Sequence, residues 1–309
     1  MKTRRRIATI VTVAIAAICF IGGWVYFHYA RPVGTGPAGP IVPKEAFGKT
    51  WTERPVLLVG LGDSVTAGFG ARRGYSYFDR LASNPTNEFP DMAGISLRAV
   101  LPELSITNFS VSGSTSIELL NRQLPRLAAS GTNIFGLVVM TTGGNDLIHN
   151  YGRTPPREEA MYGASWEEAQ SWIKNFEQRL ETIVQGLNAR FPGGCEIFVA
   201  NIYDPTDDVG DIQNAGLPAW PDARRILTTY NEVIRQCAER HDNLHLIDIR
   251  SAFLGHGIHC TQFWRKHYNS HDPHYWYFIN LEDPNERGYD AIRRLFLIEM
   301  AKVSPKFGR

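Results

Sequence analysis

The chain has 309 residues, of which 43% are apolar and 20% are charged, an ordinary balance for a globular protein. Its formal net charge is +1 and it carries no basic stripe, which argues against a protein that binds nucleic acid by counterion release.

The N-terminal 30 residues are dominated by an uncharged apolar segment. Residues 7–27 carry no charge, and the cations that precede them are Lys2, Arg4, Arg5 and Arg6. An α-helix of this length spans roughly 30 Å, the thickness of the hydrocarbon core of a bilayer. We therefore expect residues 1–30 to anchor the chain in the cytoplasmic membrane, with the following domain on the extracytoplasmic side. A cleaved signal peptide and a secreted domain are the alternative, although residues 28–31 match an Ala-x-Ala-like cleavage site poorly.

Residues 31–55 are rich in proline and glycine, which predicts a partly extended linker between the anchor and a domain at 56–309. Cys19 lies in the apolar segment, and three further cysteines lie in the domain: Cys195, Cys237 and Cys260. An exported domain could oxidise one pair of these three, but their spacing indicates no disulfide framework.

From residue 56 onwards, short apolar runs alternate with longer amphipathic ones. The runs predict strands at 56–62, 105–111, 134–142, 195–203 and 244–249. Spacings of three and four predict helices at 165–191, 219–240 and 288–303. The first of these helices begins with a capping box formed by Ser165 and Glu168. This alternation predicts one three-layer α/β/α sandwich with about five mainly parallel strands, whose ligands bind beyond the carboxyl ends of the strands.

Three residues that follow successive expected strands suggest acyl-transfer chemistry. Ser64 follows the first strand and is either a nucleophile or a helix N-cap. Gly113 follows the second strand and Asn145 the third, and each is either an oxyanion donor or part of an ordinary turn. Together they place a hydroxyl group and two N–H donors at one edge of the sheet, which is the arrangement that acyl transfer needs.

These blocks resemble the SGNH hydrolases, also called the GDSL lipase/esterase family. Gly62-Asp63-Ser64, Gly113 and Gly143-Gly144-Asn145-Asp146 match the first three blocks of that family in order. The resemblance implies a flavodoxin-like α/β/α fold, Ser64 as the nucleophile and no cofactor. It also implies an oxyanion hole formed by the Ser64 amide, the Gly113 amide and the Asn145 side chain.

The fourth block of the family, Asp-x-x-His, is not matched. Asn280 stands at the aspartate position and Asp283 at the histidine position. A carboxylate with an ordinary pKa near 4 is a poor base for a serine hydroxyl. Asp283 is better interpreted as a helix cap, with Pro284 at the first helical position and Glu286 completing a capping box.

The base is therefore sought among the five histidines between 256 and 274. Our hypothesis is that His256 or His259 accepts the Ser64 proton while Asp283 orients the imidazole, with His271 and His274 as further candidates. The same stretch is a minor candidate for a metal site, because it combines His256, His259, Cys260, His267, His271, Asp272 and His274. The acidic stretch 204–211 is expected to be a solvated loop rather than a calcium site.

The sequence thus predicts a membrane-tethered serine hydrolase that cleaves carboxylic esters through an acyl-Ser64 intermediate. The candidate substrates are acyl or acetyl esters of lipids, of envelope glycans or of imported polysaccharide, and no nucleic-acid partner is expected. A non-catalytic envelope binding or scaffold protein that keeps the fold is the alternative from another class, and the substituted fourth block is its main support. A metal-dependent hydrolase is less favoured, and the oligomeric state stays open.

Overall fold

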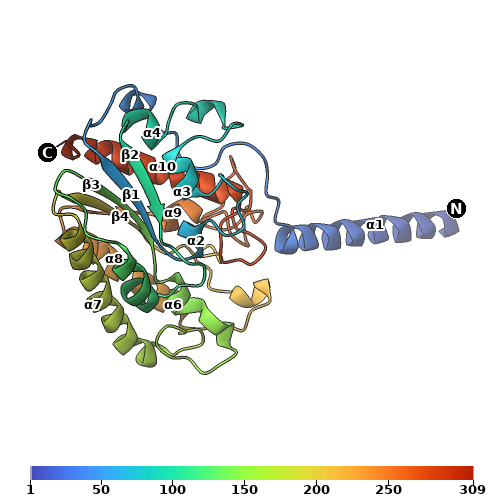
Figure 1. Ribbon diagram of the computed structural model, residues 1–309. Helices are drawn as coiled ribbons and strands as arrows, with labels where there is room; N and C mark the ends of the chain where they lie inside the picture. Colours follow the sequence, from blue (N-terminus) through green and yellow to red (C-terminus); the bar gives the residue numbers. More distant parts are fainter. Residues whose placement is uncertain (1, 309) are drawn as a thin grey trace.

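The computed structural model describes residues 2–308. A single long helix, α1 (Lys2–Tyr29), projects from a domain built on a five-stranded parallel sheet, as Figure 1 shows. The predicted α/β class with five parallel strands is confirmed. The strand order is β2-β1-β3-β4-β5, with bounds β1 (Val56–Gly62), β2 (Leu104–Asn108), β3 (Phe135–Thr141), β4 (Cys195–Ala200) and β5 (Leu244–Ile247).

Helices cover both faces of the sheet, so the strands are apolar on both sides. Leu58 of β1 pairs in register with Leu137 of β3, and both enter the same core, whereas Val59 and Val138 enter the other. The first core is closed by α3 (Tyr77–Ala82), α4 (Leu97–Val100), α9 (Ile249–Phe253) and α10 (Glu286–Val303). The second is closed by α7 (Trp166–Arg190) and α8 (Ala223–Arg240).

Short helices and turns fill the connections. The short α-helices are α2 (Ser64–Ala67), α5 (Ser116–Glu118) and α6 (Gly144–Ile148). The remaining helical turns are η1 (Lys44–Phe47), η2 (Pro90–Met92), η3 (Leu119–Gln123), η4 (Leu124–Arg126), η5 (His149–Gly152), η6 (Ile212–Ala215) and η7 (Ser304–Lys306). Helix α2 follows β1 and helix α6 follows β3, so both begin at the carboxyl edge of the sheet.

Two predicted helix starts meet different outcomes. The capping box of Ser165 and Glu168 is present at the start of α7. The cap of α10, however, is Asn285 and not Asp283, because Asn285 Oδ1 accepts from the N–H groups of Arg287 and Gly288 at 3.0 and 3.1 Å. The helix begins at Glu286 and not at Pro284, as a cap at Asp283 would require, because the backbone at 283 and 284 still pairs with residues 277 and 278. The predicted cap and capping box at Asp283 are therefore wrong.

Residues 31–43, predicted to be part of a tether, lie against the domain. The buried guanidinium of Arg287 on α10 donates to the carbonyls of Val33, Gly36 and Pro37. The N–H of Ala38 donates to Asp290 Oδ2 at 3.0 Å. An extended proline- and glycine-containing segment has unpaired carbonyls, and a buried guanidinium needs several acceptors, so each satisfies the other. The segment is thus held along α10 instead of swinging freely.

The N-terminal helix has the length and composition of a membrane span. Its segment Arg5–Tyr29 has a mean hydropathy of 2.2 in its most apolar window, and none of that window is buried within the protein. In Figure 1, α1 projects from the side of the domain where α2 lies, and the C-terminus is on the opposite side. The four cysteines are all unpaired, and the three in the domain are buried.

Candidate active site

Ser64 lies at the start of α2, directly after β1. The cap of α2 is the preceding residue, Asp63, whose carboxylate accepts from the N–H of Val65 at 3.1 Å. The same oxygen, Asp63 Oδ1, accepts from the hydroxyl of Thr141 at the end of β3, at 2.6 Å. The alternative that Ser64 is the N-cap of this helix is therefore wrong, and its hydroxyl is not needed to start the helix.

Gly62 makes this sharp strand-to-helix turn possible. Its φ is +116°, and a Cβ built on it would lie 1.8 Å from the carbonyl oxygen of Thr141. Both backbone groups of Gly62 are also held, since its N–H donates to Gln123 Oε1 and its carbonyl accepts from Gln123 Nε2, each at 2.8 Å. No other amino acid fits this position without moving β3 away from β1.

Gly62→Ala is expected to lower the free energy of unfolding by about 3 kcal/mol or more, because it combines backbone strain with a clash against a central strand. The measurement is thermal unfolding followed by circular dichroism. Gly216→Ala is the matched control, because Gly216 also has a positive φ (+84°) but faces open space. It should cost only about 1 kcal/mol, the penalty for the left-handed backbone alone. Equal losses in the two variants would contradict the role of the clash.

The two predicted oxyanion donors lie near this turn. Asn145 on α6 is buried and lines the same cavity as Ser64, and its side chain donates to the carbonyl of Ser114 at 3.1 Å. Gly113 precedes Ser114 and has a φ of +81°. Within residues 2–308, the N–H groups of Ser64 and Gly113 donate to no protein acceptor. The structure thus brings Ser64 and Asn145 to one cavity, with Gly113 attached next to them through Ser114.

Asp283 lies against Ser64, although it is not the helix cap. It is 2% exposed, and its Oδ2 accepts from Asn280 Nδ2 at 2.7 Å. Its other oxygen, Oδ1, is buried without a partner in full hydrogen-bond geometry. The Ser64 hydroxyl is nonetheless close enough to act as a hydrogen-bond donor that lowers the pKa of Asp283. The contact falls outside ordinary hydrogen-bond geometry, and catalytic contacts of this kind often tighten only when substrate binds.

Burial makes the carboxyl groups around Ser64 weaker acids than usual. Burial raises the pKa of Asp283 above its usual value of 3.8, and this effect exceeds the opposing hydrogen bonds from Ser64 and Asn280. Burial also raises the pKa of Asp63 to about 7, and Asp283 adds to this rise through like-charge repulsion. Glu282, half buried beside them, has its pKa raised to about 7 mainly by burial. A carboxylate whose pKa is raised in this way is a better proton acceptor than an exposed one.

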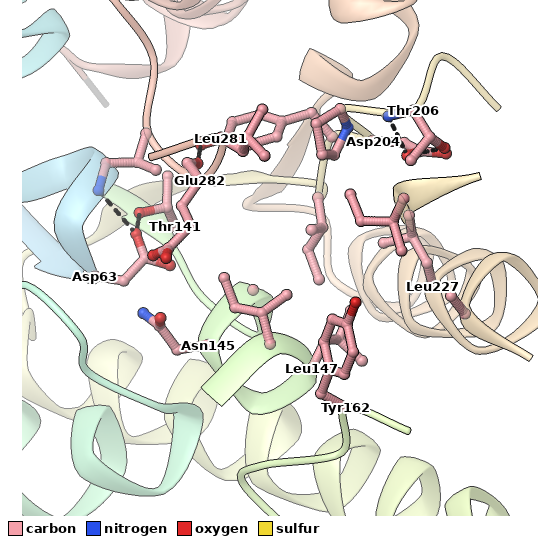
Figure 2. A pocket seen from close by; sticks show the side chains of 18 of the residues that line it. Asp63, Thr141, Asn145, Leu147, Tyr162, Asp204, Thr206, Leu227, Leu281 and Glu282 are labelled. Carbon is pink, nitrogen blue, oxygen red and sulfur yellow. Dashed lines mark hydrogen bonds between the residues drawn. The ribbon is translucent and has the colours of Figure 1, made fainter. Parts of the chain in front are cut away.

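A cavity of about 150 Å³ extends from Ser64. Asp63, Thr141 and Glu282 lie at one end, as Figure 2 shows, and Leu147, Tyr162 and Leu227 lie towards the other, where Asp204 and Thr206 are also found. The lining is completed by further apolar side chains, among them Ile148, Tyr151, Ile202, Ile212, Leu217, Trp220 and Leu281. The cavity therefore offers a reactive polar end and an apolar body, the form that a site for an acyl group takes.

The two histidines predicted to act as the base are occupied elsewhere. His256 is stacked on Trp276 with ring centroids 3.5 Å apart, and its Nδ1 is 2.9 Å from the carbonyl of His274. Burial lowers the pKa of His256 to about 4. His259 Nε2 lies 2.8 Å from Asp211 Oδ1. Neither imidazole lines the cavity that contains Ser64, so the structure does not bring these two residues together with the serine.

A different histidine lies beside the oxyanion residues. His149 Nε2 is 3.9 Å from the position that a Cβ on Gly113 would take. His149 follows α6, and the next two residues, Asn150 and Tyr151, both have positive φ values, 64° and 47°. The sequence offered no signal for this residue beyond its position four residues after Asn145.

The predicted metal ligands do not converge. Among residues 2–308, the one group of three ligand atoms within 4.8 Å of one another is formed by Glu181 on α7, Cys237 on α8 and His241 just after α8. The histidines of 256–274 form no such group. The acidic stretch 204–211 is not a solvated loop, because Asp204 and Asp207 are buried and Asp207 accepts from the N–H groups of Gly255, Gly257 and His259. Its carboxylates hold the chain around the histidines in place.

Comparisons with solved structures agree with the fold. Among solved structures, the chain is similar to an extracellular lipase from Streptomyces rimosus, with 19% identity, 80% of this chain and 99% of that chain covered, and a TM-score of 0.51. It is also similar to a mutant of Axe2, an acetyl-xylooligosaccharide esterase from Geobacillus stearothermophilus, with 19% identity, 80% and 95% covered, and a TM-score of 0.50. Likenesses at this level of identity establish the fold.

Comparison by sequence gives the family. The uncharacterized protein YpmR of Bacillus subtilis (strain 168) is 22% identical over 162 residues, which span 52% of this chain and 57% of that protein. The model of the GDSL-like lipase/acylhydrolase family matches residues 61–291, well over half of the chain and nearly all of the domain. The resemblance seen in the sequence blocks is confirmed: the chain belongs to the GDSL-like lipase/acylhydrolase family.

Proposed function

We propose that the protein is a membrane-anchored serine esterase that hydrolyses carboxylic esters through an acyl-Ser64 intermediate. The observation that carries the proposal is the shared cavity: the side chains of Ser64 and Asn145 line it, and the buried carboxyl of Asp283 contacts the serine hydroxyl. A nucleophile and a donor then face one space large enough for an ester carbonyl, and a proton acceptor lies next to the nucleophile, outside the cavity lining.

In the proposed first step, Ser64 Oγ attacks the ester carbonyl carbon while its proton passes to the carboxylate of Asp283. The negative charge that develops on the carbonyl oxygen is stabilised by the Asn145 side-chain amide and by the N–H groups of Ser64 and Gly113. The C–O bond to the leaving group then breaks, and the departing alkoxide takes the proton from Asp283. In the second step water attacks the acyl-Ser64 ester with the same proton acceptor, which releases the acid and restores the serine.

Asp283 takes the place of the histidine base in this proposal, and Asn280 positions it. The Asn280 side chain donates to Asp283 Oδ2, and its carbonyl oxygen accepts from the N–H groups of Glu282 and Asp283. This pairing repeats the spacing of the Asp-x-x-His block with an amide and a carboxylate. Burial raises the pKa of Asp283, which makes it a better proton acceptor than an exposed aspartate.

The apolar body of the cavity favours an acyl chain of several carbons over an acetyl group. Each buried methylene contributes about 0.8 kcal/mol, close to fourfold in binding. Leu227→Trp, which narrows the far end of the cavity, is expected to lower kcat/KM for an octanoyl ester about tenfold or more and to leave an acetyl ester nearly unchanged. The measurement is the hydrolysis of p-nitrophenyl esters of increasing chain length. Equal effects on both esters would contradict an acyl site at Leu227.

The proposal also includes a location for the enzyme, which rests on the N-terminal helix. We propose that α1 is retained as a single-pass anchor in the cytoplasmic membrane and that the excess of cations at its start keeps the N-terminus inside. The domain then acts outside that membrane, on esters of lipids or of envelope glycans.

The proposal is tested by reacting the purified full chain with a fluorophosphonate, which phosphonylates activated serines. Mass spectrometry of the peptides should find the adduct on Ser64. An adduct on another serine, or a metal-chelator-sensitive hydrolysis without any adduct, would replace this mechanism by another.

A further inference from the structure

The last turn of α1 is packed against the domain rather than joined to it by a loose connection. The carbonyl of Phe27 accepts from the buried side chains of Thr261 and Gln262, at 3.3 and 3.0 Å. The Phe27 ring makes edge contacts with Phe263 and Trp264, with centroids 5.5 and 5.2 Å apart. These contacts join segments more than 230 residues apart in the chain.

The chain that follows α1 is fixed as well. The carbonyl of Pro32 accepts from the N–H of Tyr275 at 2.8 Å, and Arg287 holds the next few carbonyls. Together with the contacts at Phe27, this leaves no free hinge between the apolar helix and the domain. The direction of α1 therefore determines which face of the domain meets the bilayer.

Residues 261–266, which we call the aromatic loop, have the composition of a membrane-interface element. Phe263 and Trp264 are 62% and 49% exposed although they are large and apolar. The next two residues are the cations Arg265 and Lys266. Aromatic rings favour the level of the lipid headgroups, and cations favour a surface of anionic lipids. Because the aromatic loop touches the end of a helix that spans the hydrocarbon core, it has to lie at that level.

The carboxyl edge of the sheet faces the same way. Figure 1 shows α2, which carries Ser64, on the side of the domain from which α1 projects. Three more exposed apolar side chains lie on the loops of this edge: Phe69 (46%) just after α2, Val111 (49%) after β2, and Ile279 (89%) next to the cavity residue Asn280. Single exposed apolar side chains are normal on a protein surface, whereas several that lie along one edge indicate an interaction surface.

From these contacts we infer that the aromatic loop binds the surface of the bilayer and that the rigid connection to α1 turns the mouth of the Ser64 cavity towards the lipid headgroups. The partner is a lipid surface with anionic headgroups. The inference rests on the proposed retention of α1 as an anchor, and it is independent of the reaction at Ser64. Substrates would then enter from the membrane surface rather than from the bulk solution.

The test measures depth in the membrane and not activity, so it is separate from the test of the reaction. The full chain carries Cys19→Ala and one new cysteine labelled with the fluorophore NBD, since the other cysteines are buried. The labelled positions are Phe263→Cys in the aromatic loop and Ile279→Cys, next to the cavity residue Asn280. The control is Asp242→Cys, an exposed residue before β5 at the opposite edge of the sheet. The chain is reconstituted into vesicles of phosphatidylethanolamine and phosphatidylglycerol, with and without a lipid that carries a doxyl quencher near its headgroup.

The expected result is a blue-shifted emission at 263, with loss of emission when the doxyl lipid is present, a smaller loss at 279 and none at 242. Emission at 263 that is as unquenched as that at 242 would overturn the inference. Quenching at 263 without any at 279 would show that the loop meets the lipid but that the cavity faces away, which overturns the orientation. Phe263→Ser with Trp264→Ser, labelled at 279, should also lose the quenching there, because the loop would no longer hold the edge at the surface.

Discussion

Replacing Ser64 with alanine is expected to lower kcat/KM for carboxylic esters by roughly 10⁴-fold or more, because no covalent intermediate can then form. The oxyanion donors remain in Ser64→Ala, so a small residual rate above that of water is expected. The fold should be kept, since the cap of α2 is Asp63 and no hydrogen bond of α2 depends on the Ser64 side chain. The measurement is steady-state hydrolysis of a p-nitrophenyl ester, with labelling by a fluorophosphonate alongside.

Ser251→Ala is the matched control for this experiment. Ser251 is exposed on α9, and its N–H and hydroxyl both interact with Asp248, away from the cavity of Ser64, so loss of the hydroxyl should change neither hydrolysis nor labelling. A wild-type chain that neither hydrolyses esters nor reacts with the probe would favour the alternative of a binding or scaffold protein that keeps the fold. Full activity in Ser64→Ala would show that hydrolysis, if present, takes place by another mechanism.

Replacing Asp283 with asparagine is expected to lower kcat/KM by roughly 10²- to 10⁴-fold, the usual contribution of a general base. Asparagine has the shape of aspartate and can keep the contact with Asn280, but it cannot take up the serine proton. The protein should unfold at the same temperature or a higher one, because a buried carboxyl group is replaced by a neutral amide.

The pH profile gives an independent reading of the same residue. The base acts in its ionised form, so kcat/KM rises with pH through the pKa of Asp283 and falls away below it. Burial raises this pKa above 3.8, so activity should be lost at a higher pH than for an exposed aspartate. Asn280→Ala removes a hydrogen bond that lowers the pKa of Asp283, so this acid limb should move to still higher pH.

Two variants separate Asp283 from its neighbours. Glu282→Gln removes a carboxyl group whose pKa is also raised, to about 7, and should leave the acid limb in place if Asp283 is the base. His149→Ala removes the imidazole that lies beside Gly113. A loss of activity in His149→Ala as large as that expected for Asp283→Asn, together with an unchanged rate in Asp283→Asn, would transfer the role of base to His149.

Much of the fold could be read from local patterns. The runs at 56–62 and 134–142 became β1 and β3 with bounds that differ by no more than one residue, because a buried parallel strand is apolar on both faces and ends at turn-forming residues. The capping box at Ser165 was equally readable, since its hydrogen bonds join residues three positions apart. Ser64 and Asn145 could be assigned to the edge of the sheet because each directly follows an expected strand in the sequence.

The position of Asp283 could not be read in the same way. Residues 284 and 286 are compatible with a helix that begins directly after Asp283. The actual cap is Asn285, because the chain at 283 and 284 pairs with residues 277 and 278. His256 and His259 were candidates for the base because they follow β5. In the structure His256 stacks on Trp276, and His259 is hydrogen-bonded to Asp211 on another loop. Such contacts depend on residues distant in the chain, about which a local pattern carries no information.

The amino-acid sequence alone therefore determined the apolar N-terminal helix, the parallel α/β sandwich and the serine at the carboxyl edge of its first strand, because periodicity and turn chemistry act over a few residues. Tertiary structure alone decided which carboxyl group lies next to Ser64, that burial raises the pKa of this group, and that residues 31–43 and 261–266 hold the domain against the end of α1. These features arise from contacts between residues more than 200 positions apart in the chain. Packing and desolvation determine such contacts, and a local sequence pattern carries no information about either.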